Sequence, residues 1–140
     1  MSGCFDIERC RMDYEKFKEY VVQNRWSGPK SGDEYRSLRI QLDHFVEHIK
    51  EEDSPLKWLP LDNMTEEELA TIANRFLDRC IQNRLLYQGL SYRGMKYNYN
   101  ELLIENPERE KELEMILETL PGLKKYQKLK IIELIEEINI

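Results

Sequence analysis

Residues 64–89 constrain the fold of this chain most, because they carry both the start and the stop signal of one long helix. Thr65 and Glu68 have the spacing of a capping box, in which each side chain accepts a hydrogen bond from the other residue's backbone N–H. Gly89 can adopt the left-handed conformation that commonly ends a helix. We therefore predict a helix over residues 65–88.

This predicted helix is apolar on more than one side. Its apolar residues fall on two neighbouring stripes at helical spacing. The first stripe consists of Leu69, Ile72, Ala73, Phe76, Cys80 and Tyr87, and the second of Leu77, Ile81 and Leu85. A helix with so much apolar circumference has to be covered by neighbours on two sides. We expect it to be the central helix of the fold.

Glycine and proline residues divide the rest of the chain into long uninterrupted segments. Each long segment has the 3.6-residue period of a helix, and period-two alternation is rare. The helices predicted in addition to the central one cover residues 12–25, 33–52, 107–120 and 123–138. The expected fold is all-α, a single compact bundle of about five helices. We expect residues 1–140 to form one domain, with about ten flexible residues at the N-terminus.

Residues 53–63 contain two prolines and are therefore expected to form a loop. Trp58, Leu59 and Leu61 make this loop strongly apolar. We expect it to fold over the core as a lid, because apolar loop residues usually pack locally. The alternative is that Trp58 stands out as a docking residue for another protein.

The last predicted helix has more apolar surface than one neighbouring helix can cover. Pro121 and Gly122 break the chain tightly before it, so we expect it to form an antiparallel hairpin with the helix over residues 107–120. The last helix then lies deep in the core or meets a second chain. We predict a partner-binding surface formed by Ile131, Leu134, Ile135, Ile138 and Trp58.

The charges of this last helix are in an unusual order. Lysines occupy its start and glutamates its end, the reverse of what the helix macrodipole favours. The residues concerned are Lys124, Lys125, Lys128 and Lys130, followed by Glu133, Glu136 and Glu137. We expect Glu114 and Glu118 of the preceding helix to face the lysines and to account for part of this order.

Composition and charge narrow the class of protein. Of the 140 residues, 41% are apolar and 34% charged, which is typical of a globular protein, and no apolar run is long enough to span a membrane. The net charge of −6 argues against non-specific coating of nucleic acid. Three cysteines without close spacing indicate free thiols, and the N-terminus lacks the features of a secretory signal. We expect an intracellular protein of the cytoplasm or the nucleus.

His44 and His48 lie one helical turn apart, with Glu47 between them. This H-x-x-E-H pattern occurs in inverzincin peptidases, where the histidines bind zinc and the glutamate acts as a base. The sequence supplies no separately supported third ligand. We expect these residues to form a polar helix surface, and we predict neither a metal nor a cofactor.

Arg39 and His44 form an R-x-x-x-x-H pattern that resembles the arrangement in HEPN-type ribonucleases, which are all-α proteins of similar size. The resemblance implies that the pair would polarise a scissile phosphate and move the proton of the 2′-hydroxyl across a dimer interface. Ile40 follows the arginine here, whereas that family usually has a polar residue. A surface arginine and histidine are the alternative interpretation.

Residues 120–124 resemble the turn of a helix-hairpin-helix module, in which backbone amides at the start of the second helix bind a DNA phosphate. Lys124 stands where that module has its second glycine. A tyrosine-rich segment just before residue 100 adds side chains that stack on bases or pair with phosphates. The nucleic-acid-binding residues of this hypothesis are Tyr92, Arg93, Lys96, Tyr97, Gly122, Lys124, Lys125 and Lys128.

The chain has no glycine-rich phosphate loop, no G-x-S-x-G motif and no coherent set of nucleophile, base and oxyanion donors. We therefore expect a non-enzymatic adaptor or regulatory subunit. It would bind another protein, or itself as a homo-oligomer, through its C-terminal helix. The alternatives are a nucleic-acid-binding module and a small HEPN-like ribonuclease.

Overall fold

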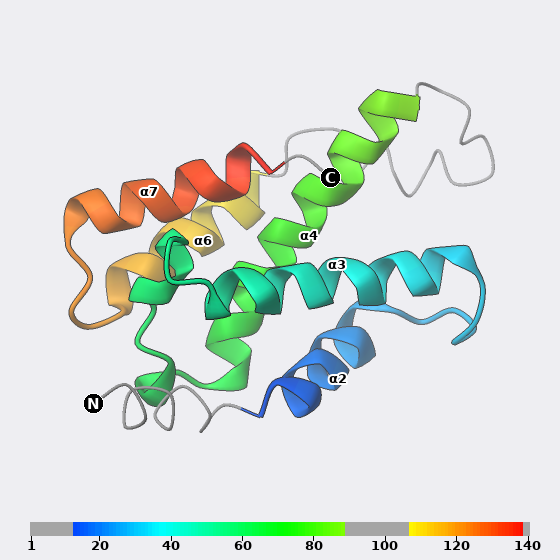
Figure 1. The fold of residues 1–140 in the computed structure, drawn as a ribbon, viewed down its shortest axis with the longest axis horizontal. Helices are drawn as coiled ribbons and strands as arrows, with labels where there is room; N and C mark the ends of the chain where they lie inside the picture. Colours follow the sequence, from blue (N-terminus) through cyan, green and yellow to red (C-terminus); the bar gives the residue numbers. More distant parts are fainter. Residues whose placement is uncertain (1–12, 89–106, 139–140) are drawn as a thin grey trace.

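The computed structural model describes residues 13–88 and 107–138, and all regular structure within them is helical (Figure 1). The α-helices are α2 (Tyr14–Arg25), α3 (Asp33–Lys50), α4 (Glu66–Gln88), α6 (Pro107–Thr119) and α7 (Lys125–Glu136). Two short 3₁₀ helices, η1 (Pro55–Trp58) and η2 (Leu61–Asn63), lie between α3 and α4. The all-α prediction is confirmed. The expected N-terminal tail and Gly89 lie outside the described residues.

Helix α4 is the centre of the molecule. Its backbone lies close to those of α2, α3, α6 and α7. In Figure 1 it crosses between the α2–α3 pair on one side and the α6–α7 pair on the other. The central position predicted from its two apolar stripes is therefore confirmed.

The start of α4 is fixed by the predicted capping box. The Thr65 backbone N–H donates to Glu68 Oε1 over 2.9 Å, and the Glu68 N–H donates to Thr65 Oγ1 over 3.1 Å. Both amides belong to the first turn, where no intrahelical acceptor exists. The two side chains thus replace the missing helical hydrogen bonds.

The core forms where the apolar faces of the helices meet α4. Phe76 of α4 is fully buried, and the Phe45 ring of α3 meets it edge-on with centroids 5.3 Å apart. Most apolar residues at helical spacing within the described helices are buried. They include Phe17, Val21, Leu38, Leu42, Phe45, Ile49, Leu69, Ile72, Leu77, Leu113 and Leu117. The helical period of the sequence therefore identifies the core faces correctly.

The segment between α3 and α4 covers the core, as expected, but it is more regular than a loop. Pro55 begins η1 directly after Ser54, whose Oγ accepts a hydrogen bond from the Leu56 N–H over 3.3 Å. Proline is tolerated at such a first position because its missing N–H would have no partner there. Leu56, Leu59 and Leu61 are buried, and η1 packs against both α3 and α7.

Polar side chains also join α4 to its neighbours. Asp78 is almost fully buried and pairs with Arg25 of α2, which also donates to Asn74. Buried Arg75 pairs with Glu110 of α6 over 2.8 Å. Because an unpaired buried charge is very unfavourable, these contacts fix how α2 and α6 are placed on α4. The apolar pattern of the sequence gave no sign of them.

Gly122 produces the turn between the last two helices. Its φ of +80° lies in the left-handed region, which strains any residue with a Cβ. After this turn α7 runs in the direction opposite to α6 (Figure 1). The predicted antiparallel C-terminal hairpin is confirmed.

We expect Phe76→Ala to lower the free energy of unfolding by about 3–5 kcal/mol, because it leaves a cavity where α4 meets α3. Met115→Ala on α6 is the control, since Met115 is 65% exposed. It should change stability by no more than about 0.5 kcal/mol. Urea denaturation followed by circular dichroism measures both values, and equal effects would contradict the assigned core.

Candidate protein-interaction surface

Helix α7 buries one side in the core. Ile131 and Ile135 are fully buried and Ile138 is 8% exposed, while Leu134 is half-buried. Two elements, α4 and η1, pack on α7 and cover this side. Three of the five residues predicted to bind a partner are therefore core residues. We expected one neighbouring helix beside α7, whereas η1 and α4 both pack on it.

The outward side of α7 nevertheless carries large apolar side chains. Tyr126 is 55% exposed and Leu129 is 54% exposed. Among the described residues two other large apolar side chains are exposed, Ile40 on α3 at 48% and Met115 on α6 at 65%. Tyr126 and Leu129 are three residues apart and so lie on neighbouring positions of the helix surface.

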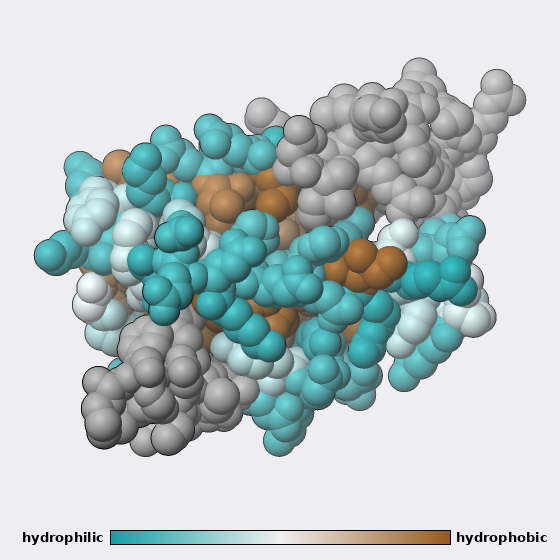
Figure 2. Space-filling view, viewed as in Figure 1, coloured by the Kyte–Doolittle hydropathy of each residue, from teal (hydrophilic) through white to brown (hydrophobic). Residues whose placement is uncertain are grey.

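An aromatic contact extends this exposed region onto η1. The Trp58 ring is half-buried and meets the Tyr126 ring edge-on, with centroids 5.8 Å apart and an interplanar angle of 75°. We call Trp58, Tyr126 and Leu129 the α7 surface. Figure 2 shows apolar residues between the hydrophilic ones over the region of α6 and α7. Trp58 is thus in part a lid residue and in part a surface residue.

The lysines at the start of α7 form no ion pair with another described residue. Lys124 and Lys125 are exposed and Lys128 is half-buried. Among the described residues, the α7 side chains form one ion pair, Lys130 with Glu133 at 3.3 Å, inside the helix itself. Glu114 and Glu118 are exposed and do not pair with these lysines. The described residues therefore show no ion pair through which α6 would account for part of the charge order.

The predicted nucleic-acid interface is described only in part. Gly122 and the three lysines lie together at the start of α7, where Gln127 Oε1 already accepts the Lys124 N–H over 2.9 Å. The tyrosine-rich half of that interface lies outside the described residues; it comprises Tyr92, Arg93, Lys96 and Tyr97. The hypothesis stays a prediction.

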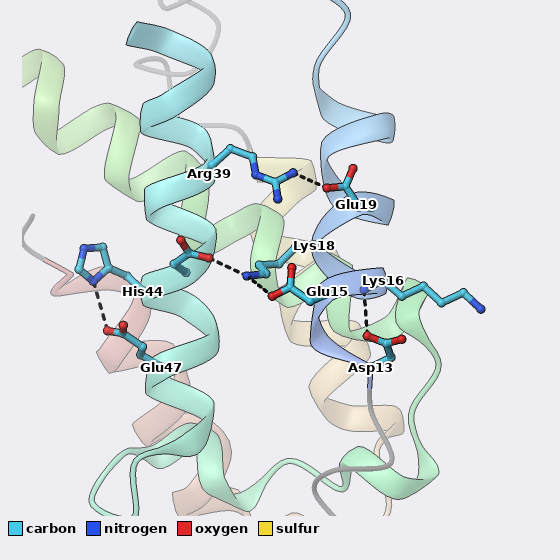
Figure 3. Close-up of polar contacts among 9 residues, drawn as sticks. Asp13, Glu15, Lys16, Lys18, Glu19, Arg39, His44 and Glu47 are labelled. Atoms are coloured by element: carbon cyan, nitrogen blue, oxygen red, sulfur yellow. Dashed lines mark hydrogen bonds and ion pairs between the residues drawn. The ribbon is translucent and has the colours of Figure 1, made fainter. Parts of the chain in front are cut away.

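Arg39 and His44 do not converge on a common point (Figure 3). The Arg39 guanidinium points toward α2 and pairs with Glu19, and this hydrogen bond holds the pKa of the Glu19 carboxyl below its ordinary value. His44 points away from α2, with its Nδ1 3.7 Å from a Glu47 oxygen. Five residues along a helix separate two side chains by about 140°, which explains this divergence.

His44 and His48 also lack the surroundings of a zinc site. The His48 ring packs edge-on against Phe76, with centroids 5.9 Å apart, and His44 faces solvent. No group of three or more His, Cys, Asp or Glu side chains within the described residues is placed to hold a metal ion. The H-x-x-E-H pattern here forms part of a helix surface.

The described residues contain one cysteine, Cys80, and its side chain is buried. Burial raises the pKa of its thiol to about 12, because the thiolate would lose its hydration. A thiol with such a pKa is protonated at neutral pH and is a poor nucleophile. Cys80 therefore acts as a packing residue of the core rather than as a nucleophile.

Comparison with protein-family models finds no match, and comparisons with curated proteins and with solved structures find none either. Within the described residues, no helix combines the length and the apolarity that crossing a membrane requires. Among the described residues, the α7 surface brings an exposed aromatic side chain, Tyr126, next to an exposed aliphatic one, Leu129.

We expect Ile135→Asp to destabilise the fold by about 4 kcal/mol or more, because it places a carboxylate without a partner in the core. Leu129→Asp, six residues earlier on the exposed side, should cost less than about 1 kcal/mol. Thermal unfolding followed by circular dichroism distinguishes the two. Similar melting temperatures would mean that α7 is oriented differently.

The raised pKa of Cys80 predicts a loss of stability at alkaline pH. Above about pH 9 the unfolded thiol releases its proton, whereas the folded thiol keeps it to about pH 12. The free energy of unfolding should fall by up to about 1.4 kcal/mol per pH unit in this range. Denaturation at pH 8 and pH 10, compared with Cys80→Ala, measures the difference. An unchanged slope in the variant would contradict the burial of the thiol.

Proposed function

We propose that this protein is a non-enzymatic adaptor or regulatory subunit that binds another protein through the α7 surface. The observation that carries the proposal is the contact of half-buried Trp58 with exposed Tyr126, next to exposed Leu129. Tryptophan and tyrosine are the residue types most often found at the energetic centre of protein interfaces. The place of action we propose is the cytoplasm or the nucleus.

The α7 surface is supported from beneath by rigid elements. Ile131 and Ile135 anchor α7 in the core, and Arg79 of α4 donates to the Glu136 carbonyl over 2.8 Å near the end of the helix. A surface that is already ordered loses little conformational freedom when a partner binds. This arrangement favours recognition over a merely incidental exposure of apolar residues.

The remaining features support a role without catalysis. Arg39 is engaged by Glu19, and His44 lies on a different side of α3. The thiol of Cys80 is buried and protonated. These observations weaken the ribonuclease hypothesis and give no support to a nucleophilic enzyme.

We expect Leu129→Asp to lose the partner that the wild-type protein captures, because a carboxylate would have to be desolvated in the interface. Ile40→Asp is the matched control, since Ile40 is also a helical aliphatic residue, 48% exposed, but lies on α3. Affinity capture from cell extract with each variant as bait, followed by quantitative mass spectrometry, compares them. The control should retain the wild-type partner.

A second variant, Tyr126→Ala, removes the aromatic contact without introducing a charge. It should weaken capture by about tenfold or more if Tyr126 is a central contact. Circular dichroism of each bait verifies that the helices are intact. Full retention of the partner by both Leu129→Asp and Tyr126→Ala would refute the proposed surface.

A further inference from the structure

The inverted charge order of α7 has no explanation within the described part of the chain. Lys125 is the first residue of the helix and Glu136 the last, so each faces the end of the macrodipole that disfavours it. Both side chains are exposed, and neither forms an ion pair with another described residue. A partner that neutralises these two charges would remove the conflict.

Four residues of α7 form a single stripe along the helix. They are spaced four, three and four positions apart, and at 100° per residue they fall within an arc of about 60°. We call this the α7 stripe; it consists of Lys125, Leu129, Ile132 and Glu136. Leu129 and the two charged residues are exposed, and Ile132 is half-buried. The stripe therefore faces outward for most of its length.

The stripe is complementary to itself when it is read in the opposite direction. Forward it reads lysine, leucine, isoleucine, glutamate; in reverse it reads glutamate, isoleucine, leucine, lysine. Two such stripes laid antiparallel place Lys125 of each chain opposite Glu136 of the other. Leu129 of each chain then lies opposite Ile132 of the other. Apolar contacts form the middle, and an ion pair forms at each end.

We propose that a second copy of this chain docks on the α7 stripe, with the two α7 helices antiparallel about a two-fold axis. The proposal rests on the proposed function, because both use the outward side of α7. Charge complementarity favours a second copy over other occupants. An acidic peptide would leave Glu136 unpaired, and a nucleic acid would be repelled by it, whereas a second α7 matches both charges and the apolar residues between them.

The two-fold symmetry accounts for the order of charges along the whole helix. Lysines dominate the first half of α7 and glutamates the second, so an antiparallel copy brings unlike halves together. The cost that each chain incurs against its own macrodipole is offset in the dimer. Since one helix pair buries less surface than stable dimers do, the association is weak and depends on concentration.

Charge reversal tests this pairing. Lys125→Glu and Glu136→Lys each create two like-charge contacts in the dimer, one at each end. Each single variant should weaken self-association by about tenfold, as measured by sedimentation velocity over a concentration series at low salt. The double variant Lys125→Glu/Glu136→Lys restores opposite charges and should return self-association to near the wild-type level.

The design separates dissociation from unfolding. Each single reversal places the charge that the macrodipole favours at its end of α7, so the monomer should be no less stable than the wild type. Lys16→Glu on α2 and Glu52→Lys after α3 change the net charge equally, on exposed residues outside the stripe. These two controls should self-associate like the wild type.

The outcomes distinguish this inference from the proposed function. A wild-type chain that is monomeric at every concentration, or a double variant no better than the single ones, overturns the second copy as occupant. If Leu129→Asp still abolishes capture of a different protein in that case, the proposed function stands. If self-association is rescued by the double variant but no other protein depends on the α7 surface, the dimer stands and the adaptor role fails.

Discussion

The packing of four helices on α4 is the constraint on which the rest of this structure depends. Because α4 touches α2, α3, α6 and α7, the positions of those four helices relative to one another follow from their separate contacts with it. Its buried apolar residues contribute to the favourable free energy of folding, because their apolar surface is removed from water. The capping box at Thr65 fixes where this central helix begins.

The charged residues buried along α4 determine how the neighbouring helices are aligned on it. Apolar contacts tolerate sliding, whereas Asp78 has to meet Arg25, and Arg75 has to meet Glu110, in one arrangement. Breaking either pair would leave a charge without its partner in a poorly hydrated place. The position of α7 is fixed in the same way, because α7 packs on α4 and Arg79 of α4 donates a hydrogen bond to its last turn. The outward side of α7 is therefore also held in place.

The candidate surface could be located from the sequence only to the level of the helix. The surplus of apolar residues on α7 indicated an interface. The helical period of these residues could not show which faces of α7 would be covered by α4 and η1. Ile131 and Ile135 are therefore buried, and Tyr126 and Leu129 form the surface instead. Arg39 and His44 illustrate a related limit, since spacing along the chain does not fix which neighbour each side chain meets, and Arg39 pairs with Glu19.

By itself the sequence determined the α-helices of the described residues, their limits to within about two residues, and their apolar faces. Caps, breakers and the 3.6-residue period act over a few neighbouring residues, which is why a sequence alone can show them. It also determined the inverted charge order of α7, which is a property of the helix alone. Only the tertiary structure decided that η1 forms a second cover for α7, and that buried Asp78 and Arg75 join α4 to α2 and α6 by ion pairs. It also decided that, among the described residues, Glu114 and Glu118 form no ion pair with Lys124, Lys125 or Lys128. Such contacts join residues that are far apart in the chain. A local sequence pattern carries no information about which distant residue will lie next to a given side chain.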